Sequence, residues 1–378
     1  MKKEKVNNKK TIFDDIPEDD LSKELSSEEI EKEKRRKKVA FKKANRVMDR
    51  IFGFMLAIVF AVGIGGLSLV YMLEKGPSPA LNDKFIHSML ETRRFDFIAD
   101  LFLTSEEVMK YSDTSEAEEQ LVSSVIDTSL FQTDTELVVD SNGADKYGLV
   151  DDDGDGIIYN VFTYHGSTCY MIVVLDPSRV FVGVTNPNSG GGLVLDDLVA
   201  KYGARGGINA GIFEDTNGSG NGWPPIGITI SQGETFNDNE SGCLAGISED
   251  GILYVGYLSY ADCVNTGIRD AVSFDPILIL NGEIVDASLL EGGISSRTCI
   301  GQRADKAIVM LVVDGRQAYS IGISQLDAAE IMFNYGCINA LNMDGGNSSS
   351  MYLDGELKNH PSNPAGGTRY LPDAWLFK

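Results

Sequence analysis

An uncharged apolar run of 23 residues, Ile51 to Leu73, constrains this chain more than any other feature. As an α-helix the run is about 35 Å long, enough to cross a hydrocarbon core of about 30 Å. A core helix of this length normally carries a polar stripe, and this run has none. The alternative is a cleavable signal peptide with its cleavage site at Ser78-Pro79-Ala80, but the 50 preceding residues are too many for the start of one. The sequence therefore predicts an uncleaved single-pass membrane anchor at 51–73.

Basic residues gather before this run. Residues 1–50 contain 16 Lys and Arg, ten of them from Lys32 to Arg50, whereas the 20 residues after the run contain three. Because positively charged flanks stay in the cytoplasm, we expect a cytoplasmic N-terminus and an extracellular C-terminal part. Residues 1–50 are expected to be a disordered charged tail, since they have little to bury. The basic stretch at 31–46 either acts as a topology signal alone or also contacts anionic lipid.

The part of the chain after the run is acidic. It contains 17 Lys and Arg against 44 Asp and Glu, a formal charge of −27. Nucleic acid is excluded as a partner, because its binding depends on Lys and Arg at the phosphates. The three histidines, at 87, 165 and 360, form no HxH or HxxxH pattern, which disfavours a dinuclear metal centre.

The acidic part divides into a stalk and a domain. Residues 74–145 combine amphipathic helical patterns, a capping signal at Thr104 to Glu107 and an acidic spacer, so we expect an extracellular helical stalk. Residues 146–378 alternate short apolar strands with Gly, Asn, Asp and Pro turns, interrupted by helical patterns at 193–203 and 324–336. The sequence predicts an α+β fold with a mixed sheet.

The helix at 324–336 has the clearest boundaries. Ser324 is the expected N-cap, Gly336 the expected stop, and Leu326, Ala329 and Phe333 the expected buried face.

All five cysteines follow the membrane run, with no CxxC pattern and an odd total. Cys299 and Cys337 lie in apolar, strand-like runs and are expected to be small core residues. Cys243 and Cys263 are candidates for a disulfide, although no pattern proves the pairing.

The segment INALNMDGGNSSSMYLDG at 338–355 is the strongest sign of a site. An apolar run of strand character stops at Asp344, and Gly345, Gly346 and a row of serines from Ser348 follow. The pattern predicts one carboxylate at the end of a buried strand. The turn beside it would hold an anion through its backbone N–H groups and serine hydroxyls.

Three further motifs precede this segment in order: GGINAGIF at 206–213, SSRTCIG at 295–301 and VVDGRQAYSIGIS at 312–324. Together the four motifs resemble the phosphodiester glycosidase family, over roughly residues 146–378. An ordered set of motifs is far more specific than one pair of glycines. The resemblance implies a domain of that family, and an enzyme that hydrolyses the glycosidic C–O bond of a glycosyl-1-phosphodiester.

The resemblance also implies roles for single residues. Asn209 would bind substrate, and Arg297 and Arg316 would hold the phosphate, to which the planar guanidinium is suited. Arg369 matches a late arginine of the family and is a further candidate ligand. Asp314 either takes part in catalysis or orients Arg316.

Cleavage at the anomeric carbon expels a phosphate monoester, a good leaving group, so the site needs arginines at the phosphate and a carboxylate near that carbon. Asp344 is the expected base or nucleophile, with Asp314 as its candidate partner. No cofactor is required. The remaining expected ligands for hydroxyls or oxyanions are Asn342, Gly345, Gly346 and Ser348, and Trp223 is a candidate to stack on a sugar ring.

The segment VDDDGDG at 150–156 has the look of a calcium loop, with Asp151, Asp153 and Asp155 at alternating positions. The twelfth position is Phe162 where a helix-loop-helix calcium site has Glu, which excludes that version. A structural turn and a bound Ca²⁺ both stay open, with the turn favoured.

Two other functions fit parts of the pattern. A surface carbohydrate-binding or exopolysaccharide-assembly protein would use the same pocket without turnover, and a metal-dependent phosphodiesterase would lose activity with a chelator. The expected partners are the lipid bilayer and a glycan phosphodiester, because the anchor places Asp344 outside the cytoplasm, where envelope or extracellular glycans are the substrates.

Overall fold

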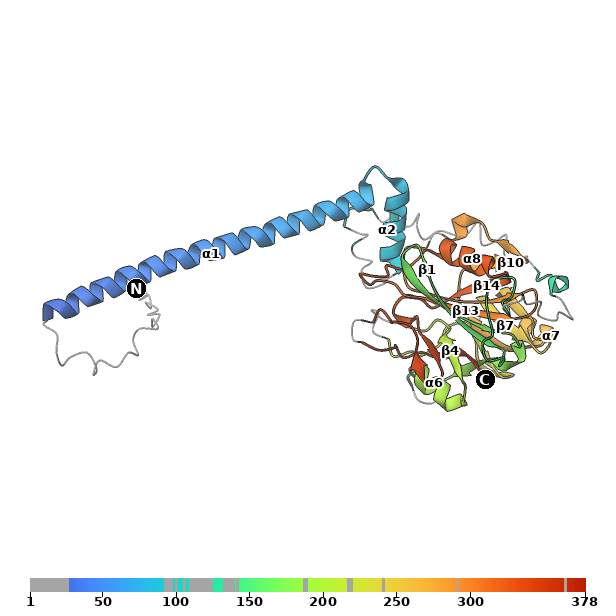
Figure 1. Cartoon of the computed structure of the whole chain (residues 1–378). Helices are drawn as coiled ribbons and strands as arrows, with labels where there is room; N and C mark the ends of the chain where they lie inside the picture. The colour runs from blue at the N-terminus through green and yellow to red at the C-terminus, as the bar shows by residue number, and fades with distance from the viewer. Residues whose placement is uncertain are drawn as a thin grey trace, which may run out of the picture. The chain divides into compact units, whose positions relative to one another are not determined.

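The computed structural model in Figure 1 describes residues 27–91, 98, 101–104, 107–108, 125–131, 140, 143–185, 190–215, 220–239, 242–290, 292–363 and 366–378. The chain divides into two compact units, Met1–Leu69 and Val70–Lys378. The first 26 residues of the predicted tail lie outside the described residues, so the disorder expected there stays a prediction.

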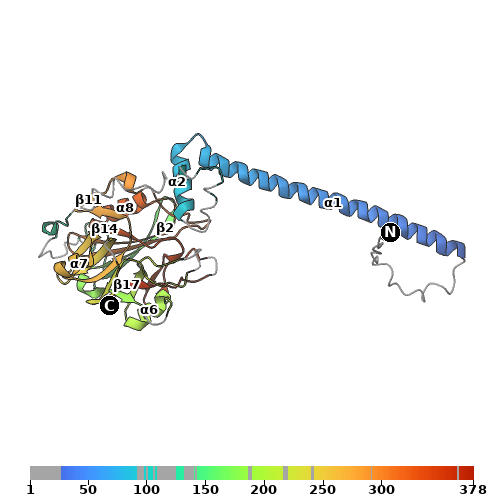
Figure 2. The same cartoon turned by 180° about the vertical axis from the view of Figure 1, so that it is seen from behind.

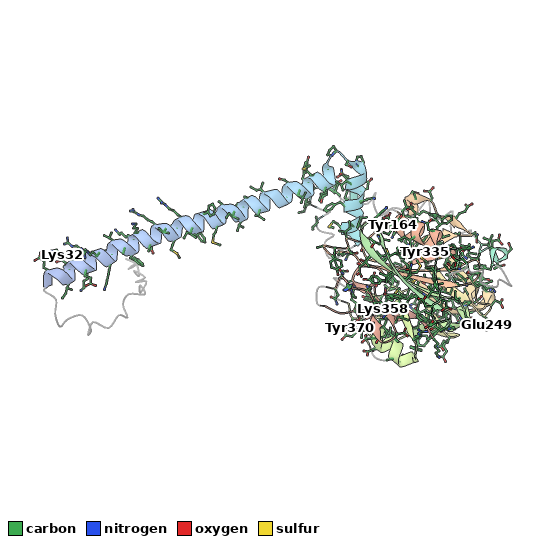
Figure 3. All side chains as sticks on the ribbon, viewed as in Figure 1. Lys32, Tyr164, Glu249, Tyr335, Lys358 and Tyr370 are labelled. Carbon is green, nitrogen blue, oxygen red and sulfur yellow. The ribbon has the colours of Figure 1, made fainter. Side chains whose placement is uncertain are left out.

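A single helix, α1 (Ser27–Lys75), runs through the predicted anchor. From Ile30 to Lys75 it is long and apolar enough to cross a membrane by length and composition, with a mean hydropathy of 2.3 in a window of which none is buried. Figure 3 shows side chains projecting from this helix along its length. A signal sequence near an N-terminus passes the same test, so the helix fits both alternatives drawn from the sequence.

Residues 27–50 are helical, where the sequence predicted disorder. Exposed ion pairs four residues apart support the helix there, and each stabilises it by about 0.3 kcal/mol. These pairs are Lys32–Glu28, Arg35–Glu31 and Lys37–Glu33.

Three sheets form the body of the second unit, and every ladder between their strands is antiparallel, so the described sheets are not mixed. The seven-stranded sheet contains, in spatial order, β1 (Ile157–Tyr164), β2 (Ser167–Val174), β13 (Ile308–Val313), β12 (Arg297–Arg303), β14 (Cys337–Met343), β10 (Ile277–Leu280) and β11 (Glu283–Ile284). The second sheet contains β16 (Glu356–Leu357), β15 (Met351–Leu353), β4 (Gly206–Asn209), β17 (Asp373–Phe377) and β3 (Val180–Val184). The third contains β6 (Glu234–Asp238), β5 (Ile228–Ser231), β9 (Ile268–Ser273), β7 (Gly242–Ser248) and β8 (Leu253–Leu258).

The inner faces of the three sheets share one hydrophobic core, and helices cover outer faces (Figure 2). β13 shows the division, since Met310 points into the shared core and its neighbour Leu311 into a second cluster under a helix. A strand buried on both faces reads as a continuous apolar run, as this one does. The covering helices are α8 (Gln325–Asn334) on the first sheet, α6 (Leu195–Tyr202) on the second and α7 (Tyr260–Thr266) on the third.

The ends of α8 confirm the predicted boundaries. The Ser324 hydroxyl accepts from the Asp327 N–H, and the Asp327 carboxylate accepts from the Ser324 N–H in return, a capping box. Gly336 follows the helix with φ +83°, a conformation that favours glycine. The predicted buried face is shifted, because Phe333 is 46% exposed while Ile331 and Met332 are buried.

The stalk region is described in part. It contains α2 (Pro79–Glu91), and Thr104 and Glu107 form the predicted capping contacts, with Thr104 N–H donating to the Glu107 carboxylate at 2.8 Å. The expected acidic spacer falls mostly outside the described residues.

All five cysteines are buried, and none of them is in a disulfide bond. Cys243 faces the shared core, whereas Cys263 lies on the buried face of α7 in a different cluster, so the candidate disulfide between them is wrong. Burial raises the pKa of Cys263 to about 11 and of Cys299 to about 12, which leaves these thiols unreactive.

We expect Ser324→Ala to lower the free energy of unfolding by about 1 kcal/mol, because α8 loses its N-terminal acceptor. Ser324→Asp keeps an acceptor and should retain most of the stability. Urea denaturation monitored by circular dichroism measures both variants, and equal losses would contradict a capping role.

Candidate active site

The candidate site lies where strand ends of two sheets meet. β13 and β14 both pair antiparallel with β12. The C-terminal ends of β13 and β14 and the start of β12 therefore lie side by side at the same end of the seven-stranded sheet. In the second sheet, the end of β4 lies beside the starts of β15 and β17. We call the residues at this junction the site edge: 209–211, 295–298, 314–316, 342–350, 359–362 and 373.

Asp344 is the first residue after β14 and is half-buried. The end of β4 holds its backbone on both sides. The Asp344 N–H donates to the Ala210 carbonyl at 2.9 Å, and the Asp344 carbonyl accepts from the Asn209 side-chain amide at 2.6 Å. A carboxylate carried on a backbone fixed in this way has the rigid placement that catalysis requires.

Asn209 links three segments of the site edge. Its side chain is fully buried, and its Oδ1 accepts from the Thr298 hydroxyl at 2.8 Å and from the Ser350 N–H at 3.0 Å. The sequence predicted a substrate ligand here. With its amide committed to protein partners beneath Asp344, Asn209 is a positioning residue.

Asp314 follows β13 and is 1% exposed. Its Oδ1 accepts from the His360 N–H at 2.9 Å and from Asn359 Nδ2 at 3.2 Å, and its Oδ2 accepts from the Tyr170 hydroxyl at 3.1 Å. The sequence left open whether Asp314 acts in catalysis or orients Arg316. These contacts hold the segment at 359–360 in place, and a part of Asp314 in catalysis stays a prediction.

His360 belongs to the same network, and the sequence analysis missed it. The His360 Nδ1 lies 3.3 Å from Asp314 Oδ2 and 3.2 Å from the Tyr170 hydroxyl, while the His360 side chain is 66% exposed. A carboxylate at Nδ1 leaves Nε2 as the ring nitrogen that a ligand can reach. Only the folded chain brings Asp314 and His360 together, so no sequence pattern announces the pair.

Arg297 differs from the prediction. Arg297 is 4% exposed, and its guanidinium donates from Nε to the Ile323 carbonyl at 3.2 Å and from Nη2 to the Gly293 carbonyl. Along β12 side chains alternate, so Arg297 shares the face of Cys299 under α8, opposite the Thr298 face that meets Asn209. Arg297 therefore ties loops together on the far face of the sheet.

Arg316 does reach the turn after Asp344. It is exposed and has φ +57°, a left-handed conformation that is uncommon for Arg and often marks functional sites. A side chain at Gly346 would come within 3.3 Å of the Arg316 guanidinium, so glycine permits this approach.

The Gly-Gly turn uses backbone amides internally. The Gly346 N–H donates to the Ser296 carbonyl at 2.9 Å, and the Ser348 N–H to the Gly345 carbonyl at 3.1 Å, because the turn tightens into a single 3₁₀ turn, η6 (Gly346–Ser348). The Gly346 N–H that was predicted to hold an anion is thus engaged within the chain, while the roles of Gly345 and of the Ser348 hydroxyl stay predictions.

Several buried polar atoms on the site edge have no hydrogen-bond partner among the described residues. Buried polar atoms are normally paired, so such atoms mark places that water or a ligand completes. Ser348, at 0% exposure, is one of them, and Asn342 donates from Nδ2 to the Asp275 carbonyl at 2.9 Å while its Oδ1 stays unpaired. The atoms are Asn342 Oδ1, Ser348 Oγ, Ser349 Oγ and Asp373 Oδ2.

Arg369 binds a neighbouring loop. Its Nη2 donates to Asp215 Oδ2 at 2.7 Å, and its guanidinium lies 4.9 Å from the centre of the Phe213 ring. Trp223, in the same loop region, is half-buried, and its stacking on a sugar stays a prediction. Arg369 and Asp215 together hold the loop beside the site edge.

Asp373 is a second carboxyl that the sequence analysis missed. It opens β17, is 1% exposed, and its Oδ1 accepts from the Gly211 N–H at 2.6 Å. Burial raises the pKa of Asp373 to about 7, helped by the charge of Asp344 and opposed by the Gly211 amide and the nearby Thr229 hydroxyl. Thr229 makes no hydrogen bond of normal geometry with Oδ2.

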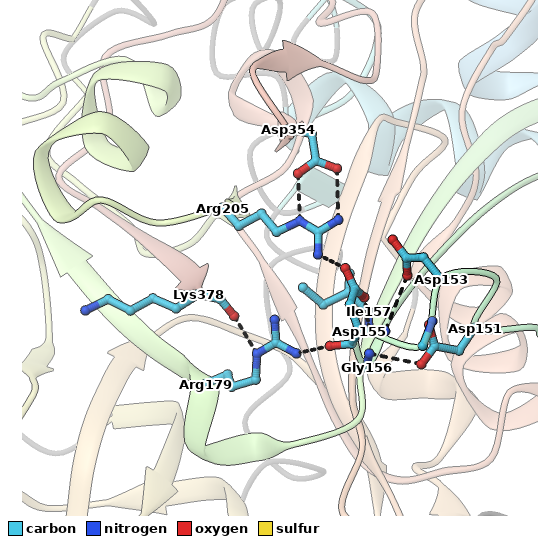
Figure 4. A network of polar contacts seen from close by, with 10 residues as sticks. Asp151, Asp153, Asp155, Gly156, Ile157, Arg179, Arg205, Asp354 and Lys378 are labelled. Carbon is cyan, nitrogen blue, oxygen red and sulfur yellow. Dashed lines mark hydrogen bonds and ion pairs between the residues drawn. The ribbon is translucent and has the colours of Figure 1, made fainter.

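The acidic loop after Val150 forms a separate network (Figure 4). Asp151, Asp153 and Asp155 offer carboxylate oxygens within 4.8 Å of one another. Asp151 and Asp153 accept from backbone N–H groups of the loop itself, and Arg205 forms an ion pair with Asp155 while it contacts Asp354 bidentately. Arg205 thus supplies positive charge beside the three carboxylates that were candidates to bind Ca²⁺.

Comparison with known proteins identifies the domain. A model of the phosphodiester glycosidase family matches residues 202–378. Over this part, the chain is similar to the phosphodiester glycosidase family. All residues of the site edge lie within the matched segment, whereas the acidic loop at 151–155 lies outside it.

The similar proteins include enzymes of animals and a bacterial protein. The mouse N-acetylglucosamine-1-phosphodiester alpha-N-acetylglucosaminidase is 29% identical over 223 residues, covering 51% of this chain and 41% of the mouse protein. The SPbeta prophage-derived uncharacterized protein YomE of Bacillus subtilis is 27% identical, covering 50% of this chain and 30% of that protein. The chain thus spans less than half the length of these curated relatives.

A solved structure shares the fold. The catalytic domain of the zebrafish N-acetylglucosamine-1-phosphodiester alpha-N-acetylglucosaminidase, auto-inhibited by its pro-peptide, superimposes with a TM-score of 0.51 at 21% identity, covering 58% of this chain and 81% of that one. The likeness confirms the predicted α+β class for the phosphodiester glycosidase domain.

We expect Asn209→Ala to lower the free energy of unfolding by about 3 kcal/mol, because it leaves the Thr298 hydroxyl, the Ser350 N–H and the Asp344 carbonyl unpaired. Urea denaturation provides the measurement. Asn334→Ala, at an exposed position near the end of α8, is the matched control and should change stability by less than about 0.5 kcal/mol. A loss no larger than that of the control would refute the positioning role.

We expect millimolar Ca²⁺ to change the Tm of the full chain by less than about 2 °C, because Arg205 already balances part of the negative charge of the loop. Differential scanning calorimetry with Ca²⁺ and with EDTA measures this. A rise of many degrees with Ca²⁺, lost in Asp153→Asn, would instead establish a bound cation.

Proposed function

We propose that the protein is a hydrolase that cleaves the glycosidic C–O bond of a glycosyl-1-phosphodiester. The proposal rests above all on Asp344, a half-buried carboxylate fixed by two hydrogen bonds at the junction of two sheets in a phosphodiester glycosidase domain. The animal relatives are named for this type of reaction on N-acetylglucosamine-1-phosphodiesters.

The chemistry follows from the leaving group. Departure of a phosphate monoester from the anomeric carbon leaves a sugar with oxocarbenium character, which a carboxylate stabilises by its charge or by attack. Asp344 takes this role as base or nucleophile. The departing phosphate needs little protonation, so its main requirement is a cation.

Arg316 is the cation that we assign to the phosphate. Its exposed guanidinium lies against Gly346, two residues beyond Asp344. The unpaired hydroxyls of Ser348 and Ser349 provide donors for phosphate oxygens or sugar hydroxyls from the same turn. Arg297, which faces the other side of the sheet, has no part in this assignment.

We further propose that α1 anchors the protein in a membrane, with its N-terminus in the cytoplasm and the glycosidase domain outside. The support is the apolar window of α1 and the excess of Lys and Arg before it. Glycosyl phosphodiesters of the envelope or of extracellular glycans are then the accessible substrates.

A binding protein for the same glycans is the second candidate function, because an arginine and hydroxyl donors suffice to bind a phosphodiester. Asp344 separates the two functions, since binding of an anion gains nothing from a carboxylate at the site. We therefore favour turnover.

The test is Asp344→Asn in the full chain, assayed for free sugar released from a diester of N-acetylglucosamine 1-phosphate. We expect the rate to fall at least about 100-fold with folding retained, because the amide can neither accept a proton nor stabilise positive charge. Asp238→Asn, at an exposed position on β6, is the matched control and should keep the wild-type rate.

Three outcomes distinguish the alternatives. Undiminished turnover in Asp344→Asn would sink the assignment of this residue. Retention of the diester without release of sugar by the wild-type protein would favour a binding protein. Loss of wild-type activity in EDTA would favour metal-dependent hydrolysis at the P–O bond.

A further inference from the structure

Asp373 lies on the other side of the peptide bond that holds Asp344. The Ala210 carbonyl accepts from the Asp344 N–H, and the next N–H along the chain, that of Gly211, donates to Asp373 Oδ1. Gly211 permits this close approach, because a side chain there would lie within 2.8 and 3.0 Å of the two Asp373 oxygens. One peptide unit thus contacts the backbone of Asp344 and the carboxyl group of Asp373, two residues that come from different sheets.

The surroundings of Asp373 do not neutralise a negative charge. Its strand neighbours are Val184 on β3 and, beside Ala374, Asn209 on β4, while Val272 of β9 packs against Gly211. Thr229 of β5 is close but uncharged. Asp344 is the one ionisable group that acts on Asp373 among the described residues, and it carries the same sign of charge.

We propose that Asp373 is a positioning residue that keeps a proton in mildly acidic to neutral conditions, so that Asp344 carries the only negative charge of this pair of carboxyl groups. The orphaned Oδ2 is where that proton resides. As the pH rises, Asp373 releases its proton to water, and a second buried negative charge then opposes the anionic phosphodiester. Turnover falls, so Asp373 sets the alkaline limit of the proposed hydrolysis.

The effect on turnover rests on the proposed function, whereas the protonation of Asp373 does not. Burial, aided by Asp344, raises the pKa of Asp373 to about 7 in the folded chain, against 3.8 as its ordinary value. The folded state therefore holds a proton that the unfolded state loses above about pH 4. The contribution of this proton to the free energy of unfolding is therefore fully present below about pH 4, and it is lost as the pH rises to about 7.

The experiment compares full-length wild type with Asp373→Asn, which keeps an acceptor for the Gly211 N–H but has no proton to lose. We expect wild-type kcat/KM to fall about tenfold from pH 6 to pH 8, following ionisation of a group with a pKa near 7, and the variant to lose much less. Superimposable pH profiles would overturn the proposal.

Urea midpoints between pH 4 and pH 8 give a readout without substrate. The wild-type midpoint should fall with pH more steeply than that of Asp373→Asn. Asp270, whose pKa burial raises to about 6, titrates in both proteins and cancels in the comparison. If the urea midpoints of wild type and Asp373→Asn differ with pH but no hydrolysis is found, the protonation of Asp373 stands and the proposed function is rejected. If hydrolysis occurs but the two proteins show the same dependence of midpoint and of kcat/KM on pH, only the role of Asp373 is rejected.

If Asp373→Asn fails to fold, the wild-type protein still decides. Infrared spectra of protein labelled with ¹³C at aspartate carboxyls should show a protonated carboxyl band at pH 6.5 that disappears by pH 8.5, in a step at higher pH than the step of Asp270. Absence of that band at pH 6.5 would overturn the proposal.

Discussion

The side-chain amide of Asn209 is the interaction on which the site depends. It joins the end of β4 to β12 through Thr298, to the start of β15 through Ser350, and to the turn after β14 through the Asp344 carbonyl. These segments belong to two different sheets, and a fully buried amide can join them because it donates and accepts at once. The placement of Asp344 is therefore a property of how two sheets meet.

Sequence patterns identified the strand ends but not the direction of their side chains. Asp344 was predictable, because an apolar strand run stops at a carboxylate followed by two glycines. Arg297 was misassigned although its position at the start of β12 was anticipated. The face of a strand on which a side chain lies depends on register, and a shift of one residue exchanges the two faces. Thr298, its neighbour, is the residue that reaches Asn209.

Asp373 and His360 could not be found from sequence for a related reason. Each gains its significance from a partner more than 25 positions away, Asp344 for Asp373 and Asp314 for His360. By contrast, the cap of α8 at Ser324 depends on residues three positions apart, and the sequence predicted it. Local hydrogen bonds follow from local sequence, whereas coupling between carboxyls depends on sheet packing and burial.

The two sheets also divide the electrostatics of the site. The seven-stranded sheet presents Asp344 in a half-buried position, just before the turn that the Arg316 guanidinium reaches at Gly346. The second sheet presents Asp373 in a fully buried position, where burial favours the neutral form. Unequal burial thus places two identical side chains in different electrostatic surroundings. Substitutions in the shared core that shift one sheet against the other would change the distances of Asp344 and Asp373 from the Ala210–Gly211 peptide. Such substitutions would therefore alter the difference in burial between the two residues without contacting either carboxyl group.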